Sequence, residues 1–274
     1  MPAISLKNHP FRIQPGGKVD ITAIPTTDES LFPMEKKEGE ELMKSFAKEI
    51  DELQTRLYAE GKQRLLVIFQ AMDTGGKDGV IRNVFDKMDP QGIRVASFKR
   101  PSPLELAHDY LWRIHQEVPQ NGEVVIFNRS HYEDILAVRV REIFPKSRWE
   151  KRYDHIVNFE QMLADEGTTI LKIFLNISPD EQKQRLQARL DDSEKLWKFN
   201  PGDLDDRALW PKFMEAYSDV LEKTSTEAAP WYAVPADRKW YRDLVVADIL
   251  IKTLKGLDMK YPSVDFDPKT ITID

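Results

Sequence analysis

The chain has 274 residues, enough for one large α/β domain or for such a domain with a mobile lid, because a chain of about 300 residues buries about three quarters of its unfolded surface. Its composition, 41% hydrophobic and 31% charged, is that of a globular protein. The absence of Cys excludes a disulfide scaffold and thiolate metal sites, and the net charge of −6 argues against general binding of nucleic acid.

Residues 1–20 contain no apolar segment of the kind found in signal peptides, and no apolar run approaches the roughly 18 residues of a membrane span. The sequence therefore predicts neither secretion nor a membrane partner, and a cytoplasmic location is the default expectation. The five His residues are scattered and give no zinc-binding spacing: His9, His108, His115, His131 and His155.

Turn residues and hydrophobic periodicity divide the chain into an N-terminal arm over 1–34, a main domain over 35–260 and a C-terminal tail over 261–274. Predicted helices cover 35–60, 77–88, 103–116, 131–144, 148–166, 180–190, 207–222 and 241–257. Predicted strands cover 65–70, 93–98, 123–127, 170–177 and 231–235. Strands rich in Val, Ile, Leu and Phe that alternate with helices predict an α/β fold, with a parallel sheet flanked by helices on both faces.

The most informative segment is the turn after the first predicted strand, residues 71–79, which reads Ala-Met-Asp-Thr-Gly-Gly-Lys-Asp-Gly. It is an altered phosphate-binding loop, whose usual pattern is Gly, four residues, Gly-Lys and then Ser or Thr. Ala71 replaces the first Gly and Asp78 replaces the hydroxyl residue, whereas Gly76 and Lys77 stand at their usual places. Such a loop cradles a polyanion with its backbone N–H groups and its lysine.

Several side chains of this segment are candidates for phosphate or metal binding. Lys77, after Gly75 and Gly76, is expected to reach the phosphates, and Asp73 is expected to point into the same cradle. A second interpretation of Asp73 and Asp78 is capping of the helix N-terminus, worth about 0.5–2 kcal/mol. Arg82, one turn beyond Asp78, either faces the same anion or pairs with that carboxylate.

The third predicted strand ends in a second polar cluster. Asn128 occupies the place where P-loop enzymes usually carry a metal-holding Asp, and Arg129 is expected to lie beside the phosphates. Ser130 and Glu133 have the spacing of a capping box, which would account for Glu133 without a functional role. Asp134 is freer to compensate for Asn128 as a metal or nucleotide contact.

Basic residues after the fourth predicted strand suggest a helical lid over about 180–207. Gln182, Arg185 and Arg189 share one helix face, and the segment Lys-Leu-Trp-Lys-Phe-Asn follows at 195–200. The alternative is local pairing of Glu181 with Arg185 and of Arg189 with Asp192. A further basic run over 138–152 is either a local anion track or, as charge alone favours, a solvated helix face.

Four motifs in this order resemble the polyphosphate kinase 2 family over about 31–257, and the third is similar to its class III branch. They are Ala71-Met72-Asp73-x-x-Gly76-Lys77-Asp78-Gly79, Phe98-Lys99-x-Pro101, Asn128-Arg129-Ser130-His131-Tyr132-Glu133-Asp134 and Lys195-x-Trp197-Lys198-Phe199-Asn200.

The resemblance implies a P-loop kinase fold similar to thymidylate kinase. The implied activity is reversible, direct in-line transfer of the terminal phosphoryl group of inorganic polyphosphate to AMP or ADP, with Mg²⁺ or Mn²⁺. It implies adenine or guanine nucleotides as partners and a homodimer or homotetramer.

The resemblance also assigns roles to residues of this sequence. The implied catalytic residues are Asp73, Lys77, Asn128, Arg129, Glu133 and Asp134. The implied phosphate-binding residues are Lys77, Arg129, Arg185, Arg189 and Lys198, to which the loop pattern itself adds Gly75, Gly76, Asp78 and Arg82. Lys99, Asn128, Glu133 and Asp134 would bind the nucleotide, and Asp73 with Asp134 would hold the metal.

Two other functions are compatible with the loop. An ATP-dependent nucleoside or nucleotide kinase of the same fold would be expected to keep a hydroxyl residue where Asp78 stands. A non-catalytic protein that binds nucleotide or polyphosphate is favoured only by Asn128, a poorer metal partner than Asp.

Overall fold

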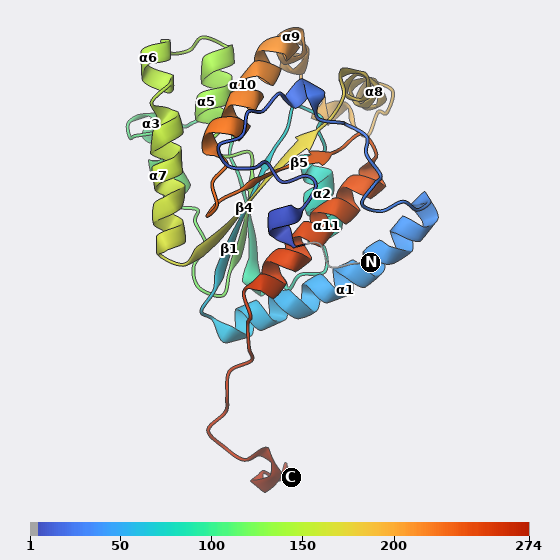
Figure 1. Cartoon of the computed structure of the whole chain (residues 1–274), viewed down its shortest axis with the longest axis vertical. Helices are drawn as coiled ribbons and strands as arrows, with labels where there is room; N and C mark the ends of the chain where they lie inside the picture. Colours follow the sequence, from blue (N-terminus) through green and yellow to red (C-terminus); the bar gives the residue numbers. More distant parts are fainter. Residues whose placement is uncertain (1–4, 274) are drawn as a thin grey trace.

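Runs of Val, Ile, Leu and Phe form a single five-stranded sheet in the computed structural model, which describes residues 5–273 (Figure 1). The strand order is β2-β3-β1-β4-β5, and every neighbouring pair is parallel. The strands are β1 (Arg64–Gln70), β2 (Ile93–Ser97), β3 (Val124–Asn128), β4 (Thr168–Asn176) and β5 (Trp231–Pro235). The predicted α/β class is confirmed, and each strand boundary lies within about two residues of its predicted place.

Helices cover both faces of the sheet because successive side chains of a strand point to opposite sides. Leu65, Val67 and Phe69 enter one core, and Leu66 and Ile68 enter the other. The first core is closed by α1 (Lys36–Glu60), α2 (Lys77–Val84) and α11 (Lys239–Gly256). The second is closed by α5 (Glu133–Val140), α7 (Arg152–Asp165) and α10 (Trp210–Thr224), which lie on the opposite side of the sheet in Figure 1.

Three predicted helices are wrong in their continuity. The helix predicted over 103–116 is two short pieces, α3 (Pro103–Leu106) and α4 (Trp112–His115), because the Asp109 side chain accepts hydrogen bonds from two following backbone N–H groups and forms a turn. The segment predicted over 148–166 divides into α6 (Lys146–Trp149) and α7.

The third is the helix predicted over 207–222, which divides into α9 (Gly202–Ala208) and α10. Pro211 lies in the first turn of α10, where its ring favours a new helix start. Two other predicted helices end early, at Val84 instead of 88 and at Val140 instead of 144. The helix after β4 is α8 (Pro179–Leu190), close to its prediction.

The N-terminal segment lies along the outer edge of the sheet. The backbone N–H of Ile13 donates to Trp231, and that of Ala233 donates to Phe11, so the segment makes an antiparallel bridge with β5. Residues after 260 extend away from the body (Figure 1). Residues 1–4 of the predicted arm and residue 274 of the predicted tail lie outside the described residues, and the division of the chain at 34 and 260 stays a prediction.

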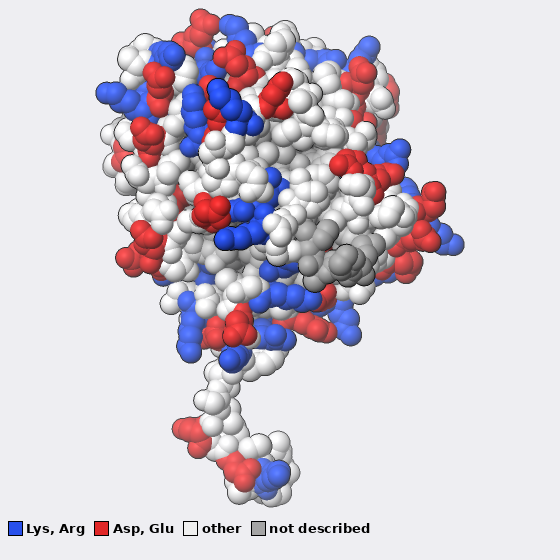
Figure 2. Space-filling view, in the orientation of Figure 1, with Lys and Arg blue, Asp and Glu red and all other residues white. Residues whose placement is uncertain are grey.

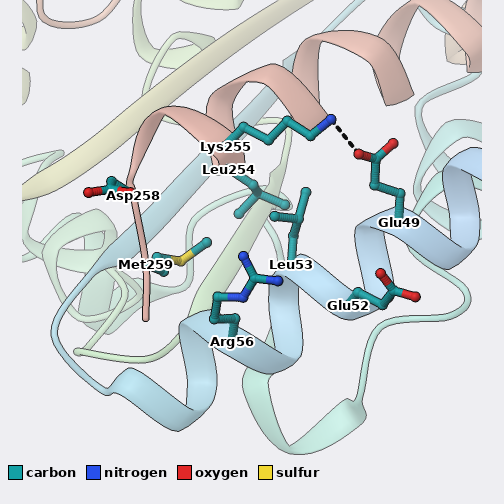
Figure 3. Close-up of a pocket in the computed structure, with 8 residues that line it drawn as sticks. All are labelled: Glu49, Glu52, Leu53, Arg56, Leu254, Lys255, Asp258 and Met259. Atoms are coloured by element: carbon teal, nitrogen blue, oxygen red, sulfur yellow. Dashed lines mark ion pairs between the residues drawn. The ribbon is translucent and has the colours of Figure 1, made fainter. Parts of the chain in front are cut away.

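Helices α1 and α11 pack against one another along most of their length. Figure 3 shows one end of this contact, a cavity of about 200 Å³ where Lys255 of α11 pairs with Glu49 of α1 above Leu53 and Leu254. Farther along, Gly39 of α1 faces α11 directly: a Cβ there would lie 2.6 Å from the ring of Trp240. The glycine therefore sets how closely the two helices approach.

Replacing Gly39 by alanine should lower the free energy of unfolding by about 1–3 kcal/mol, because the new methyl group overpacks the contact with Trp240. At an exposed helix position, the same change from glycine to alanine would instead raise the free energy of unfolding by up to about 1 kcal/mol. The matched control is Gly256→Ala in α11, where no atom lies within 4 Å of the new Cβ. Urea unfolding of both variants checks this; a Gly39→Ala protein as stable as the Gly256→Ala protein would contradict it.

Candidate active site

The phosphate-binding loop has the expected strand–turn–helix geometry at the carboxyl end of β1. Gly76 precedes α2 with φ +100°, and Thr74 adopts φ +61°, both in the left-handed region. A Cβ on Gly75 would lie 2.5 Å from the Ala71 side chain, and one on Gly76 would overlap the guanidinium of Arg242. The two glycines are therefore required by the shape of the loop.

Lys77 is buried within this loop. Its Nζ donates hydrogen bonds to the carbonyl oxygens of Ala71 (2.9 Å) and Met72 (3.4 Å). Burial, together with the nearby charge of Arg129, lowers the pKa of Lys77. The lysine thus lies inside the cradle, where an incoming anion would favour its charged form.

Asp73 and Arg129 come together from two different strand ends. Asp73 follows β1 and Arg129 follows β3, and Arg129 Nη2 lies 2.8 Å from Asp73 Oδ1. Arg129 adopts φ +62°, an uncommon conformation for a residue with a side chain. The predicted neighbours are therefore in direct contact, on a backbone that is strained at Arg129.

The two departures from the usual loop pattern are bonded to one another. The amide Nδ2 of Asn128 donates to Asp78 Oδ1 at 2.6 Å. An Asp at position 128 would instead place a second carboxylate against Asp78, and the two negative charges would repel each other. Asp73 and Asp78 do not cap α2, because Gly76 is its N-cap and makes no side-chain cap hydrogen bond, but Asp78 lies in the first turn, where its charge pairs with the helix dipole.

Glu133 faces the same cluster. Burial raises the pKa of Glu133, whereas the charges of Arg129 and Lys77 lower it. The capping-box interpretation is wrong: α5 has Tyr132 as its N-cap and no side-chain cap, and the Ser130 hydroxyl instead accepts from the Tyr132 backbone N–H at 3.2 Å. Glu133 is therefore free to act on the ligand side of the site.

Asp134 is engaged by arginines instead. Its Oδ1 lies 3.4 Å from Arg152 and its Oδ2 lies 3.8 Å from Arg113, which also donates to the Lys99 carbonyl oxygen at 2.9 Å. The Lys99 side chain itself is exposed. Asp134 thus belongs to the β2–β3 side of the site, and its predicted sharing of a metal with Asp73 stays a prediction.

Helix α8 lies over the loop and contacts its backbone. Gln182 donates to the carbonyl oxygen of Asp73 at 3.0 Å, and Arg185 donates to that of Thr74 at 3.1 Å. Arg185 also pairs with Glu181 at 2.6 Å, so the predicted local pair coexists with the loop contact. These bonds join the predicted lid to the phosphate-binding loop.

Arg189, one turn farther along α8, connects two parts of the predicted lid. It donates to the Lys198 carbonyl oxygen at 2.9 Å and lies 3.3 Å from Asp203. Its predicted pairing with Asp192 is wrong, since Asp192 pairs with Lys195 instead. The Lys198 amine lies over the Trp197 ring, 5.0 Å from its centre.

The polyphosphate kinase 2 model matches residues 33–262. The chain is 54% identical to a Meiothermus ruber protein named AMP/ADP-polyphosphate phosphotransferase, over 96% of this chain and 99% of that one. It is 44% identical to the ADP-polyphosphate phosphotransferase of Rhodopseudomonas palustris, over 94% and 93%. The chain belongs to the polyphosphate kinase 2 family. The crystal structure of polyphosphate kinase 2 from Arthrobacter aurescens TC1 superposes with a TM-score of 0.93 at 43% identity, covering 98% of this chain and 96% of that one.

In this polyphosphate kinase 2 chain, α9 brings two acidic residues to the site that the sequence did not indicate. Asp206 accepts from the Arg141 guanidinium with both oxygens at 2.7 Å. Burial, with the charge of Asp73 next in size, raises the pKa of Asp203 to about 6. Burial also raises the pKa of Asp206, and Asp73 adds to that shift. The only sequence signal was their i, i+3 spacing, which places both on one helix face.

The structure also bears on two other predictions. Arg82 is exposed and, among residues 5–273, makes no ion pair with Asp78, so that alternative is wrong and its contact with the phosphates stays a prediction. The basic run divides in two: Arg139 pairs with Asp219 and Glu215, and Arg152 pairs with Asp134. Its other basic side chains are exposed, as the solvated-face interpretation predicted, namely Arg141, Lys146, Arg148 and Lys151. On the face shown in Figure 2, acidic and basic side chains are intermingled.

Within the described residues, no three His, Asp or Glu side chains are grouped so that they could hold a metal ion by themselves. No described helix is long and apolar enough to cross a membrane.

Proposed function

We propose that this polyphosphate kinase 2 transfers the terminal phosphoryl group of inorganic polyphosphate to AMP and to ADP, reversibly and by direct in-line displacement. One observation carries the proposal: the buried Lys77 and the Asp73–Arg129 pair meet at a phosphate-binding loop over which α8 is already docked. The relatives' names supply the donor and acceptors, and the site supplies the cations that a transferring phosphoryl group requires.

Each group has a role that follows from its position. The loop N–H groups and Lys77 would bind the phosphates flanking the bond that breaks, and Arg129 would stabilise the charge that develops on the transferring group. Arg185, Arg189 and Lys198 would hold the phosphate chain from the lid side. Phosphoryl transfer then depends mainly on positioning and charge neutralisation.

The nucleotide is proposed to approach from the β2–β3 side. Asn128, Glu133 and Asp134 border that side, and Lys99 stands at the end of β2. Adenine nucleotides are the proposed acceptors, with guanine nucleotides as a second set. A phospho-enzyme on the nearby His131 is disfavoured, because that imidazole is fully buried and its Nε2 lies 3.1 Å from Glu160.

Mg²⁺, or Mn²⁺ in its place, is the proposed cofactor. Asp73 lies at the phosphate-binding loop beside Arg129, and its charge adds to the raised pKa of Asp203 and Asp206, so acidic residues surround the place that the phosphates would occupy. No complete protein cage is needed, since Mg²⁺ is commonly held by one or two carboxylates together with substrate phosphates and water. When bound, the ion would neutralise charge on the reacting phosphates. Asp73 is the proposed protein ligand, assisted by Asp134 or by the α9 carboxylates.

The acceptor and donor are tested together. The purified protein is incubated with Mg²⁺ and polyphosphate plus either AMP or ADP, and the products are separated by chromatography. The proposal predicts ADP and ATP from AMP, and ATP from ADP. Phosphorylation of AMP by ATP without any reaction of polyphosphate would favour a nucleotide kinase instead. Binding of polyphosphate without turnover of any nucleotide would favour a non-catalytic protein.

The assembly and location are further proposals that rest on family resemblance. We infer a homodimer or homotetramer in the cytoplasm, without a nucleic-acid or membrane partner. Light scattering coupled to size-exclusion chromatography would distinguish a monomer from either assembly.

A further inference from the structure

A buried ion pair that the proposed reaction does not use lies beneath the turn that contains Arg129. We propose that Glu160 and Lys172 are positioning residues for phosphoryl transfer, which act through His131 and Tyr132 to fix Arg129 against Asp73. This inference rests on the proposed function, because it assigns the pair a role in that reaction.

The pair forms a closed network beneath the site. Lys172 Nζ donates to Glu160 Oε2 at 2.6 Å and to the Tyr132 hydroxyl at 3.0 Å. The Tyr132 hydroxyl donates to Glu160 Oε1 at 2.7 Å, and His131 Nε2 lies 3.1 Å from the same oxygen. All four side chains are at most 2% exposed. One carboxylate therefore holds two consecutive residues of the Arg129 turn.

The network is anchored to three different elements of the second core. Glu160 belongs to α7 and Lys172 to the middle of β4, and the third Lys172 hydrogen bond reaches the Thr224 carbonyl oxygen at the end of α10 (2.6 Å). Trp231 of β5 donates to the Thr224 hydroxyl at 2.9 Å, and its ring lies 5.2 Å from Lys172 Nζ. The turn that contains Arg129 is thus hydrogen-bonded, through His131 and Tyr132, to side chains anchored in the second core.

Burial disfavours the charged form of both partners. Burial lowers the pKa of Lys172, and Glu160 opposes this shift. Burial works to raise the pKa of Glu160, but Lys172 and His131 lower it. A buried ion pair is often no more stabilising than apolar side chains of similar volume, so its contribution to stability alone does not account for it.

Arg129 lies between two fixed points. On one side, Asn128 is the last residue of β3 and is paired in register with Phe69. On the other side, His131 and Tyr132 are held by Glu160. A non-glycine residue at φ +62° persists only where its surroundings enforce it. Releasing His131 and Tyr132 would let the turn relax and would move the Arg129 guanidinium away from Asp73.

The test is a double-mutant cycle in turnover. The kcat for ATP formation from polyphosphate and ADP is measured for the wild type, Glu160→Gln, Arg129→Ala and the double variant, at a temperature where circular dichroism shows each to be folded. We expect Glu160→Gln to lower kcat about 10- to 100-fold, since a displacement of about 1 Å can cost that much, and to change the KM for ADP little. In the Arg129→Ala background it should cause no further loss.

A role confined to core stability predicts a different result. Equal losses from Glu160→Gln with and without Arg129, or an unchanged kcat, would overturn the proposal. If Glu160→Gln does not fold, the apolar pair Glu160→Met with Lys172→Met replaces it, and a normal kcat in that folded protein would also overturn the proposal. Asp248→Asn, which breaks the remote ion pairs with His9 and Lys252, is the control and should leave kcat unchanged. A wild type without polyphosphate turnover would refute the proposed function itself.

Discussion

Replacing Lys77 by alanine is expected to lower the turnover of polyphosphate and ADP at least about 100-fold. The lysine is buried in the loop, where its ammonium group donates to the carbonyl oxygens of Ala71 and Met72. Without its ammonium group, the phosphates at the loop would lose the cation that is buried inside it. Steady-state kinetics with ADP as acceptor measure the loss.

The Lys77 variant must remain folded for this result to be interpreted. Circular dichroism and the thermal midpoint of the variant should stay close to those of the wild type. Lys87→Ala is the matched control, since Lys87 is exposed and, among residues 5–273, pairs only with its neighbour Asp86. Turnover within about 3-fold of the wild type in the Lys77 variant would remove the lysine from the proposed mechanism.

Arg129→Ala is expected to have an effect at least as large, about 100-fold or more on kcat. Arg129 donates to Asp73 across the site, and its planar guanidinium can bond two phosphate oxygens at once. Arg129→Lys keeps the charge but loses this fork, so we expect it to recover only part of the activity. The three proteins are compared at saturating polyphosphate and ADP.

A control with the same change in charge separates this effect from a general loss of positive charge. Arg56→Ala removes an arginine that lines the cavity between α1 and α11 (Figure 3). The Arg56 guanidinium lies over the Tyr261 ring, away from the site. It should leave kcat unchanged. If Arg129→Lys were fully active, the proposed fork to the transferring phosphoryl group would be wrong.

The sequence predicted the sheet and the loop because both depend on local patterns. Leu65 to Phe69 is a short apolar run of strand length, and Gly75-Gly76-Lys77 marks the turn that follows. Parallel strands bring their carboxyl ends to one edge, so the approach of Asp73 to Arg129 followed from topology.

Features set by distant contacts were not predictable in the same way. Arg242 lies about 165 residues from the loop in sequence, yet it fills the space beside Gly76. Asp206 is drawn toward the site by Arg141, and no local pattern pairs these two residues. The bond between Asn128 and Asp78 explains two departures that each looked unfavourable when considered alone.

The central claim is that polyphosphate itself donates the phosphoryl group at this site, directly to the nucleotide. Polyphosphate labelled with ³²P, unlabelled ADP and Mg²⁺ are mixed with the enzyme in a single turnover, and the products are separated from the protein under denaturing conditions. The account predicts label in ATP and none on the protein. Labelled ATP should appear at the wild-type turnover rate, and its formation should be lost in Lys77→Ala. Labelled protein that forms before ATP, or no label in the nucleotide, would contradict it.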